Sequence, residues 1–362
     1  MTKHNLRKTL LLLPFLVLSS CQSPSELAQL FIYDSTDTFI KSLRYDLSAK
    51  LDNYIAYETH YAERKQTTQN EQTIAALDDS RTKIMVMNTV DRLASSALIE
   101  KAEKKNVPII FINREPLTED FDGAWAQKNC FYVGSDPSYE GKLQAEIADQ
   151  IFGGAANFKG SIYDKNGDGT VQVLLLKGEQ GHQDTEQRSQ FCISRLKGLG
   201  YTVSIVQTAY CNWERSVAKE TMAKLYSSEI ELLFSNNDDM ALGAIDYLNN
   251  PGPLSSSSIS SSIASSTAAT SSISSSSSDS SLPFDQRYFP IIGVDDTSEG
   301  QKAIDAGTLA GTVLNNANRQ ATVIFDLMKH VLKETPIPVY DSNQVVPTGN
   351  FYHVLGEVVR KK

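Results

Sequence analysis

Oxygen-bearing residues alternate along one short segment near the middle of the chain, in the pattern that calcium loops use. The segment begins at Asp164 and has the sequence Asp-Lys-Asn-Gly-Asp-Gly-Thr-Val-Gln, in which glycine allows a sharp turn. The alternate positions supply the candidate ligands Asp164, Asn166, Asp168, the backbone carbonyl of Thr170, and Gln172. This spacing predicts a calcium site. The alternative is a turn of Asx and Gly residues that binds no metal.

The loop lacks the residue that closes an EF-hand. An EF-hand ends in a bidentate Glu at the twelfth position, whereas this chain has Leu175 there, inside the strand-like run from Val171 to Leu176. Without that carboxylate the loop offers fewer protein oxygens than the roughly six to eight that calcium usually takes. A further carboxylate must therefore come from another part of the chain.

The N-terminal segment is typical of a bacterial export signal. Basic residues precede an apolar run from Leu10 to Leu18, which is shorter than the roughly 20 residues that a membrane-spanning helix needs. The run leads into Leu18-Ser19-Ser20-Cys21, which resembles a lipobox. We therefore expect residues 1–21 to be a lipoprotein signal and Cys21 to be lipidated, which would anchor the protein to a bacterial membrane. An ordinary cleaved signal is the alternative.

Charge and cysteine content exclude some partners. The formal net charge is −9, so nucleic acid is not an expected partner. Beyond the signal, the cysteines are Cys130, Cys192 and Cys211, and their spacing does not suggest a zinc site. We expect buried free thiols. The alternative is one disulfide, which an exporting compartment permits.

The rest of the chain alternates apolar runs with segments of helical spacing. Strands are expected at Leu30 to Tyr33, Tyr54 to Tyr57, Ile84 to Met87, Val107 to Ile112, Val171 to Leu176, Thr202 to Val206, Leu232 to Phe234 and Pro290 to Val294. Helices are expected at Thr38 to Leu51, Gln69 to Leu77, Arg92 to Lys105, Tyr139 to Phe152, Asp184 to Leu199, Glu214 to Tyr226, Asp239 to Asn249 and Gln320 to Leu332. This βα order predicts an α/β fold with parallel sheets covered by helices on both faces. Roughly 340 mature residues favour two lobes over one.

One segment interrupts this alternation. From Leu254 to Leu282 the chain is almost wholly Ser, with scattered Ile, Ala and Thr, and prolines flank it. Such a composition buries too little apolar area to offset its ordering entropy. We expect a disordered insertion; a glycosylated or interaction loop is the alternative.

Six motifs in order resemble the bacterial D-galactose/D-glucose-binding proteins. They are Thr36-Asp37-Thr38-Phe39, Phe111-Ile112-Asn113-Arg114-Glu115-Pro116, the run from Lys177 to Arg188, Asn236-Asn237-Asp238-Asp239-Met240-Ala241, Gly293-Val294-Asp295, and Ala310-Gly311-Thr312-Val313-Leu314-Asn315. The resemblance implies a class I periplasmic binding protein with two Rossmann-like lobes and a hinge of three crossings. The implied lobes are 28–133 with 315–349, and 136–313 with 350–362. It also implies a monomer that is not an enzyme.

The resemblance further implies a site and its partners. Two aromatics, Phe39 and Trp213, would stack on D-glucose or D-galactose, because a pyranose has weakly polar C–H faces. A rim of hydroxyl partners would surround them: Asp37, Asn113, Arg114, His182, Asp184, Arg188, Asn237, Asp295 and Asn315. Glu231 would complete the calcium site. Arg114 stands where the family has Lys, which leaves the choice between glucose and galactose open. The sugar would pass to an ABC transporter permease, and a chemoreceptor is a further implied partner.

Other functions compete with this interpretation. A glycoside hydrolase also places carboxylates near aromatics, but it needs a protonated acid across the scissile bond. No catalytic motif such as GxSxG is visible. A LacI-type repressor shares the fold but would begin with a DNA-binding head. A carrier for ribose or another monosaccharide is the nearer alternative.

Overall fold

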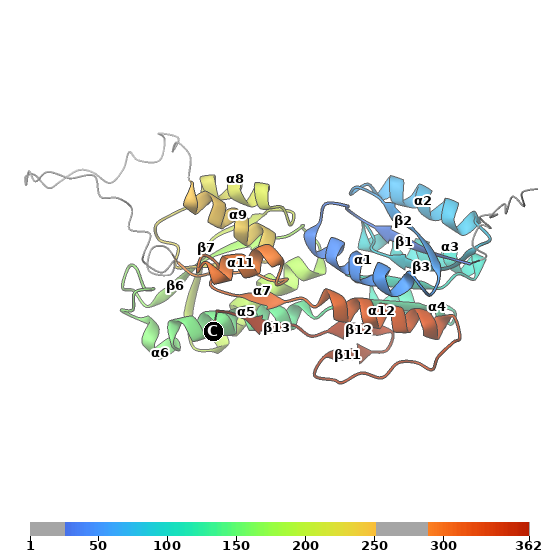
Figure 1. Cartoon of the computed structure of the whole chain (residues 1–362). Coiled ribbons are helices and arrows are strands. Elements are labelled where there is room, and N and C mark those ends of the chain that lie inside the picture. Colours follow the sequence, from blue (N-terminus) through green and yellow to red (C-terminus); the bar gives the residue numbers. More distant parts are fainter. Residues whose placement is uncertain (1–25, 251–288, 362) are drawn as a thin grey trace, which may run out of the picture.

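The computed structural model describes residues 26–250 and 289–361. The predicted lipidation site Cys21 and the Ser-rich tract from Leu254 to Leu282 lie outside these ranges. Within the described ranges, no helix has both the length and the apolar character needed to cross a bilayer. Figure 1 shows two lobes side by side, each formed by a sheet and its covering helices.

The first lobe contains a seven-stranded sheet in the order β11-β12-β5-β4-β3-β1-β2. Its strands are β1 (Leu27–Ile32), β2 (Ala56–Tyr61), β3 (Thr82–Met87), β4 (Ile109–Ile112), β5 (Cys130–Ser135), β11 (Val345–Thr348) and β12 (Phe351–Val354). Its helices are α1 (Thr38–Leu51), α2 (Gln66–Asp78), α3 (Ser95–Lys105), α4 (Ala126–Asn129) and α12 (Ala317–Val331), with short 3-10 turns at Arg92–Ala94 and Thr118–Phe121. All strand pairs are parallel except β11 with β12.

The second lobe contains a four-stranded parallel sheet in the order β7-β6-β8-β9. Its strands are β6 (Thr170–Lys177), β7 (Thr202–Tyr210), β8 (Leu232–Ser235) and β9 (Ile291–Ile292), and a separate antiparallel pair joins β10 (Thr312–Leu314) to β13 (Glu357–Val359). Its helices are α5 (Pro137–Phe152), α6 (Ala155–Phe158), α7 (Gln183–Gly198), α8 (Arg215–Leu225), α9 (Asp238–Asn249) and α11 (Ser298–Asp305). A bridge from Ile292 to Gly311 brings β10 beside β9.

Both sheets bury side chains on two faces, because alternate residues of a strand point in opposite directions. In β1, Leu30 and Ile32 pack against α1 and α12, whereas Phe31 packs with residues of α2 and α3. In β6, Val173 packs with α5 and α7, and Leu174 with α8, α9 and α11. The predicted α/β fold with helices on both faces is therefore confirmed. Strand β11 corrects the expectation of wholly parallel sheets, since it is joined to β12 by a tight connection.

The chain passes between the sheets three times. The crossings follow β5, β10 and β12. The third lies later than the sequence suggested. Residues from 350 onward were expected in the second lobe, but β12 pairs with β5 in the first lobe, and only β13 reaches β10 in the second. Hydrogen bonding to β5 holds this short strand in the larger sheet.

Most of the expected elements form, with ends shifted by a few residues. The clearest omissions are β5, the short strands β10 to β13, and helix α11, none of which was predicted. Strand β5 is buried on both faces and so lacks the alternation of a half-exposed strand, and β10 to β13 have only three or four residues each. The described cysteines Cys130, Cys192 and Cys211 are buried and unpaired, which confirms the expectation of free thiols.

Candidate functional site

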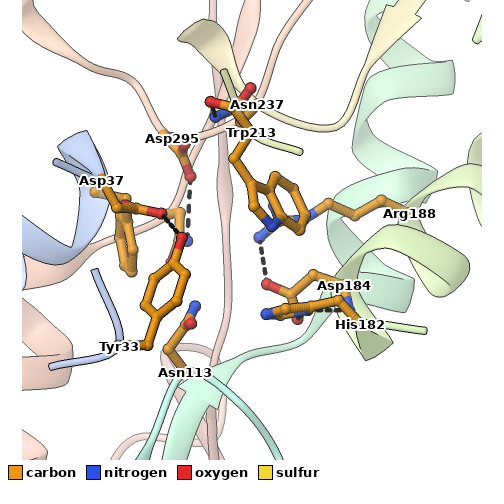
Figure 2. Close-up of a pocket in the computed structure, with 11 residues that line it drawn as sticks. Tyr33, Asp37, Asn113, His182, Asp184, Arg188, Trp213, Asn237 and Asp295 are labelled. Carbon is orange, nitrogen blue, oxygen red and sulfur yellow. Dashed lines mark hydrogen bonds and ion pairs between the residues drawn. The ribbon is translucent and has the colours of Figure 1, made fainter. Parts of the chain in front are cut away.

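One pocket lies where the carboxyl ends of strands from both lobes meet. It is lined by Tyr33, Asp37, Phe39, Asn113, His182, Asp184, Arg188, Trp213, Asn237, Asp295 and Asn315 (Figure 2). In both lobes the strand order is that of a doubly wound sheet, in which ligands bind outside the carboxyl ends of the strands. About 330 Å³ within the pocket is not filled by protein atoms, a volume that includes space open to solvent. Every predicted sugar-binding residue except Arg114 lines it.

Helix starts position three of these side chains. Asp37 is the N-cap of α1, and its Oδ1 accepts a hydrogen bond from Ile40 N at 2.9 Å. Asn237 caps α9 in the same way through Met240 N at 3.0 Å, and His182 caps α7. Caps satisfy backbone N–H groups that the first helical turn leaves free. The folding of each helix thus fixes a polar side chain at the pocket.

Positive φ angles orient three further residues. Asn113 has φ 60°, Trp213 has φ 68° and Asp295 has φ 118°. Residues other than glycine rarely adopt such angles, and where they do so the surrounding structure must hold them. Asn113 directly follows β4, and Trp213 and Asp295 lie within three residues of the ends of β7 and β9. Strained backbone of this kind occurs at many functional sites.

Aromatic side chains reach the pocket from both lobes. Phe39 is a buried residue of α1 in the first lobe, and Trp213 follows β7 in the second. The indole of Trp213 packs so tightly against Gly178 that a Cβ built there would lie 2.3 Å from the ring. The edge of His182 supports it as well, with ring centroids 5.1 Å apart. Gly178 therefore has a packing reason to lack a side chain.

Arg188 is held by carboxylates on two sides. Its Nη2 lies 3.0 Å from Asp184 Oδ2, and its Nε lies 2.8 Å from Glu140 Oε2. A third bond runs from Nη1 to the carbonyl oxygen of Asn236 at 2.9 Å. Burial raises the pKa of Glu140 to about 7, and the Arg188 guanidinium opposes that rise. The network keeps a buried cation paired and fixed in one orientation.

Burial favours the neutral form of both Asp295 and His182. Burial raises the pKa of Asp295 well above its usual value, against the opposing effect of Arg188. Burial lowers the pKa of His182 well below its usual value, and Arg114 and Arg188 lower it further, so the imidazole is neutral near pH 7. Because Nδ1 of His182 accepts from Asp184 N at 3.2 Å, its proton lies on Nε2, which is then a hydrogen-bond donor. The rim therefore combines donors and acceptors.

Two residues of this region escaped the sequence analysis. Tyr33 ends the first strand run, and its hydroxyl donates to Asp37 Oδ2 at 2.6 Å (Figure 2). Glu140, fully buried on α5, supports Arg188. A tyrosine after three apolar residues resembles an ordinary core position, and a glutamate in an amphipathic helix resembles a surface one. The sequence carries no signal that distinguishes them.

Arg114 lies behind Tyr33, beside the pocket. It does not line the pocket, and its guanidinium lies over the ring of Tyr33, 4.0 Å from the centroid. Its Nη2 pairs with Glu179 Oε2 at 2.5 Å. The left-handed backbone of Asn113 turns the chain between these neighbours, so that Asn113 lines the pocket and Arg114 does not.

The predicted calcium loop and Glu231 lie together. The Glu231 carboxylate accepts from the backbone N–H of Lys165 at 2.6 Å and of Gln172 at 3.1 Å. The amide oxygen of Gln172 is buried without a hydrogen-bond partner in the described structure. Within residues 26–250 and 289–361, no cluster of three or more His, Cys, Asp or Glu is spaced to hold a metal. The donors are all oxygens, including amide and carbonyl groups that such a cluster does not count, and they fit a hard cation.

Comparisons with known proteins agree with this geometry. A family model described as periplasmic binding protein domain matches residues 29–336, and the chain belongs to this family. The D-galactose/methyl-galactoside binding periplasmic protein of Haemophilus influenzae is 29% identical over 307 residues, covering 83% of this chain and 80% of that protein. The ribose import binding protein of Escherichia coli is 22% identical over 234 residues, covering 64% of this chain and 60% of that protein.

Solved structures show the same fold. An ABC transporter periplasmic solute binding protein from Actinobacillus succinogenes, solved with bound D-allose, aligns with a TM-score of 0.69 at 18% identity. The alignment covers 93% of this chain and 98% of that one. Family membership makes this chain a binding protein and not an enzyme, which confirms the prediction from sequence.

Proposed function

We propose that this protein captures D-galactose or D-glucose in the pocket between its lobes and presents the sugar to an ABC transporter. The observation that carries the proposal is the pocket itself, where Phe39 from one lobe and Trp213 from the other meet a rim of charged and amide side chains. The likeness to the galactoside-binding protein of Haemophilus influenzae supports the choice of sugar.

The rim suits hydroxyl groups. Asp37, Asp184 and Asp295 supply acceptors, and a sugar hydroxyl is both donor and acceptor. Asn237 offers an amide that both donates and accepts. Charge-assisted bonds are shorter and stronger than neutral ones, so the carboxylates would fix the orientation of the ring. Neither lobe alone surrounds a ligand, and sugar binding would therefore stabilise closure of the lobes.

Two further elements of the proposal concern the rest of the molecule. The protein would act in the periplasm, held to the membrane by a lipid on Cys21. Calcium, bound by the loop from Asp164 to Gln172 with Glu231, would stabilise the second lobe. Support for the metal comes from the all-oxygen donor set and the unpartnered amide oxygen of Gln172. When bound, the ion would neutralise the carboxylates gathered at the loop.

The test is titration calorimetry with D-galactose and D-glucose on wild type and two tryptophan variants. Trp213→Ala removes one wall and is expected to weaken binding by about 1 to 3 kcal/mol, a factor of about 5 to 150 in Kd. Trp125→Ala is the matched control, because Trp125 contacts Asn106 in the first lobe and does not line the pocket. Unchanged affinity in Trp213→Ala, or equal losses in both variants, would count against the proposed site.

A further inference from the structure

Two arginines of the first lobe bridge the cleft in parallel. Arg114 lies on the ring of Tyr33, and Arg64 pairs with the neighbouring Asp34, so both arginines contact residues that directly follow β1. Each arginine then reaches a glutamate of the second lobe. Arg114 contacts Glu179 at 2.5 Å, and Arg64 contacts Glu214 at 2.6 Å. The two pairs therefore tie one strand end to two loops of the other lobe.

The two glutamates are about equally exposed, so the pairs differ in the burial of the arginine. The Arg64 and Glu214 side chains are 37% and 41% exposed, so water and salt screen their attraction. The Arg114 side chain is only 5% exposed. The Glu179 carboxylate raises the pKa of Arg114, although burial opposes the rise. Removing the partner of a buried charge is costly, because the charge stays desolvated without compensation.

We propose that Arg114 and Glu179 form an interlobe clasp that stabilises the closed lobes, and that Arg114 also positions Tyr33 and, through it, Asp37. When the lobes separate, Glu179 leaves with the second lobe. Arg114 then keeps the Val90 carbonyl, 2.6 Å from Nη1, as its remaining described hydrogen-bond acceptor. Separation of the lobes therefore removes the Glu179 counter-ion from the Arg114 guanidinium. The inference rests on the proposed function, since closure on a sugar is its setting.

Tyr33 links the ion pair of Arg114 to the pocket residue Asp37. The guanidinium lies flat on the Tyr33 ring, and the Tyr33 hydroxyl donates to Asp37 Oδ2. The other oxygen of Asp37 is engaged by the α1 cap. A planar arginine can stack on an aromatic ring and pair with a carboxylate at once, whereas lysine is a point donor. The arginine at this position is therefore suited to an interlobe contact.

The experiment compares Glu179→Gln and Arg114→Lys with Glu214→Gln, the matched change in the exposed pair. Rapid-mixing fluorescence would give association and dissociation rates for D-galactose and D-glucose, and small-angle scattering would give the compactness of the sugar-free protein. We expect Glu179→Gln to raise the dissociation rate about tenfold with little change in association, because it leaves the buried Arg114 guanidinium without its counter-ion. Glu214→Gln is expected to change either rate less than about twofold.

The positioning role has its own readout. Tyr33→Phe removes the hydroxyl bond to Asp37 and keeps the ring under Arg114, so it should weaken sugar affinity without changing the compactness of the sugar-free protein. Glu179 is 42% exposed, so its variant is expected to fold normally, which circular dichroism would verify. In a Glu179→Gln background, Arg114→Lys should not expand the sugar-free protein further, since both changes act on one ion pair, whereas a further loss of sugar affinity is expected from the lost stacking on Tyr33.

The outcomes separate this inference from the proposed function. If wild type binds neither sugar, the proposed function fails. Small-angle scattering then still tests the clasp. Glu179→Gln should expand the sugar-free protein, and Glu214→Gln should not. Equal compactness of Glu179→Gln and wild type, together with an unchanged dissociation rate where a sugar binds, would overturn the clasp. Unchanged affinity in Tyr33→Phe, where wild type binds, would overturn the positioning role.

Discussion

Adding one methyl group at Gly178 should weaken sugar binding without removing any group that touches the sugar. A Cβ at this position would lie 2.3 Å from two atoms of the Trp213 indole and 2.4 Å from a third. Carbon atoms in contact are ordinarily about 3.5 to 4.0 Å apart, so the ring must move by more than about 1 Å. Trp213 lines the pocket and Gly178 does not, and the ring therefore moves toward the ligand.

The size of the effect follows from the loss of stacking. A displaced Trp213 indole loses much of its stacking contact with the sugar ring. Comparable stacking is worth about 1 to 3 kcal/mol. Gly178→Ala should therefore raise Kd by a factor of about 5 to 150. The backbone of Gly178 has no positive φ, so alanine fits its conformation, and its N–H can still donate to Asn236.

A double-mutant cycle isolates this mechanism. Titration calorimetry would compare Gly178→Ala in wild type and in Trp213→Ala, where the indole that causes the clash is gone. The methyl group should cost affinity only in the presence of Trp213. An equal loss of sugar affinity in both backgrounds would show that the methyl group acts by another route. Unchanged affinity of Gly178→Ala in the wild-type background would refute the stacking role of Trp213.

Three other predictions concern stability and the regions beyond the pocket. Chelation of calcium should lower the melting temperature, and Glu231→Gln should abolish that response; an equal melting temperature with chelator and with calcium would refute the metal site. Burial raises the pKa of Asp238 to about 7 from an ordinary 3.8. The folded protein therefore holds the Asp238 proton more tightly than the unfolded chain does. The stabilisation from this proton is full below about pH 4 and is lost as the pH rises through 7. Urea unfolding of Asp238→Asn should therefore show the variant gaining on wild type from pH 5 to 8, whereas a constant difference would contradict the burial argument. Replacing residues 254–282 with a short Gly-Ser link should leave sugar affinity unchanged, because loop closure entropy varies only slowly with length; a loss of affinity in a folded variant would give the tract a role in binding.

How far the sequence predicts this molecule depends on where each residue lies. Asp37, Asn237 and Asp295 follow apolar strand runs, and strand ends in a doubly wound sheet converge on one edge, so their meeting could be expected. The helix α1 was predicted with its observed ends, because Asp37 caps it. Long elements with strong periodicity are the ones that sequence patterns identify.

The direction of a side chain is less predictable than its position in the sequence. Asn113 and Arg114 are neighbours, yet only the first lines the pocket, because a left-handed backbone turns the chain between them. Glu140 is buried by α7 and paired with Arg188, a contact between residues far apart in sequence. Such contacts follow from the packing of whole elements and leave no local pattern.

Titration calorimetry of the protein from Gln22 onward against a panel of monosaccharides tests the central claim most directly. The panel would contain the monosaccharides D-galactose, D-glucose, D-allose and D-ribose, with the cyclitol myo-inositol added. We expect one site per chain, with D-galactose or D-glucose bound more tightly than the other members and no chemical change in the sugar. Tighter binding of D-ribose or another member, or the absence of binding by both hexoses, would contradict it.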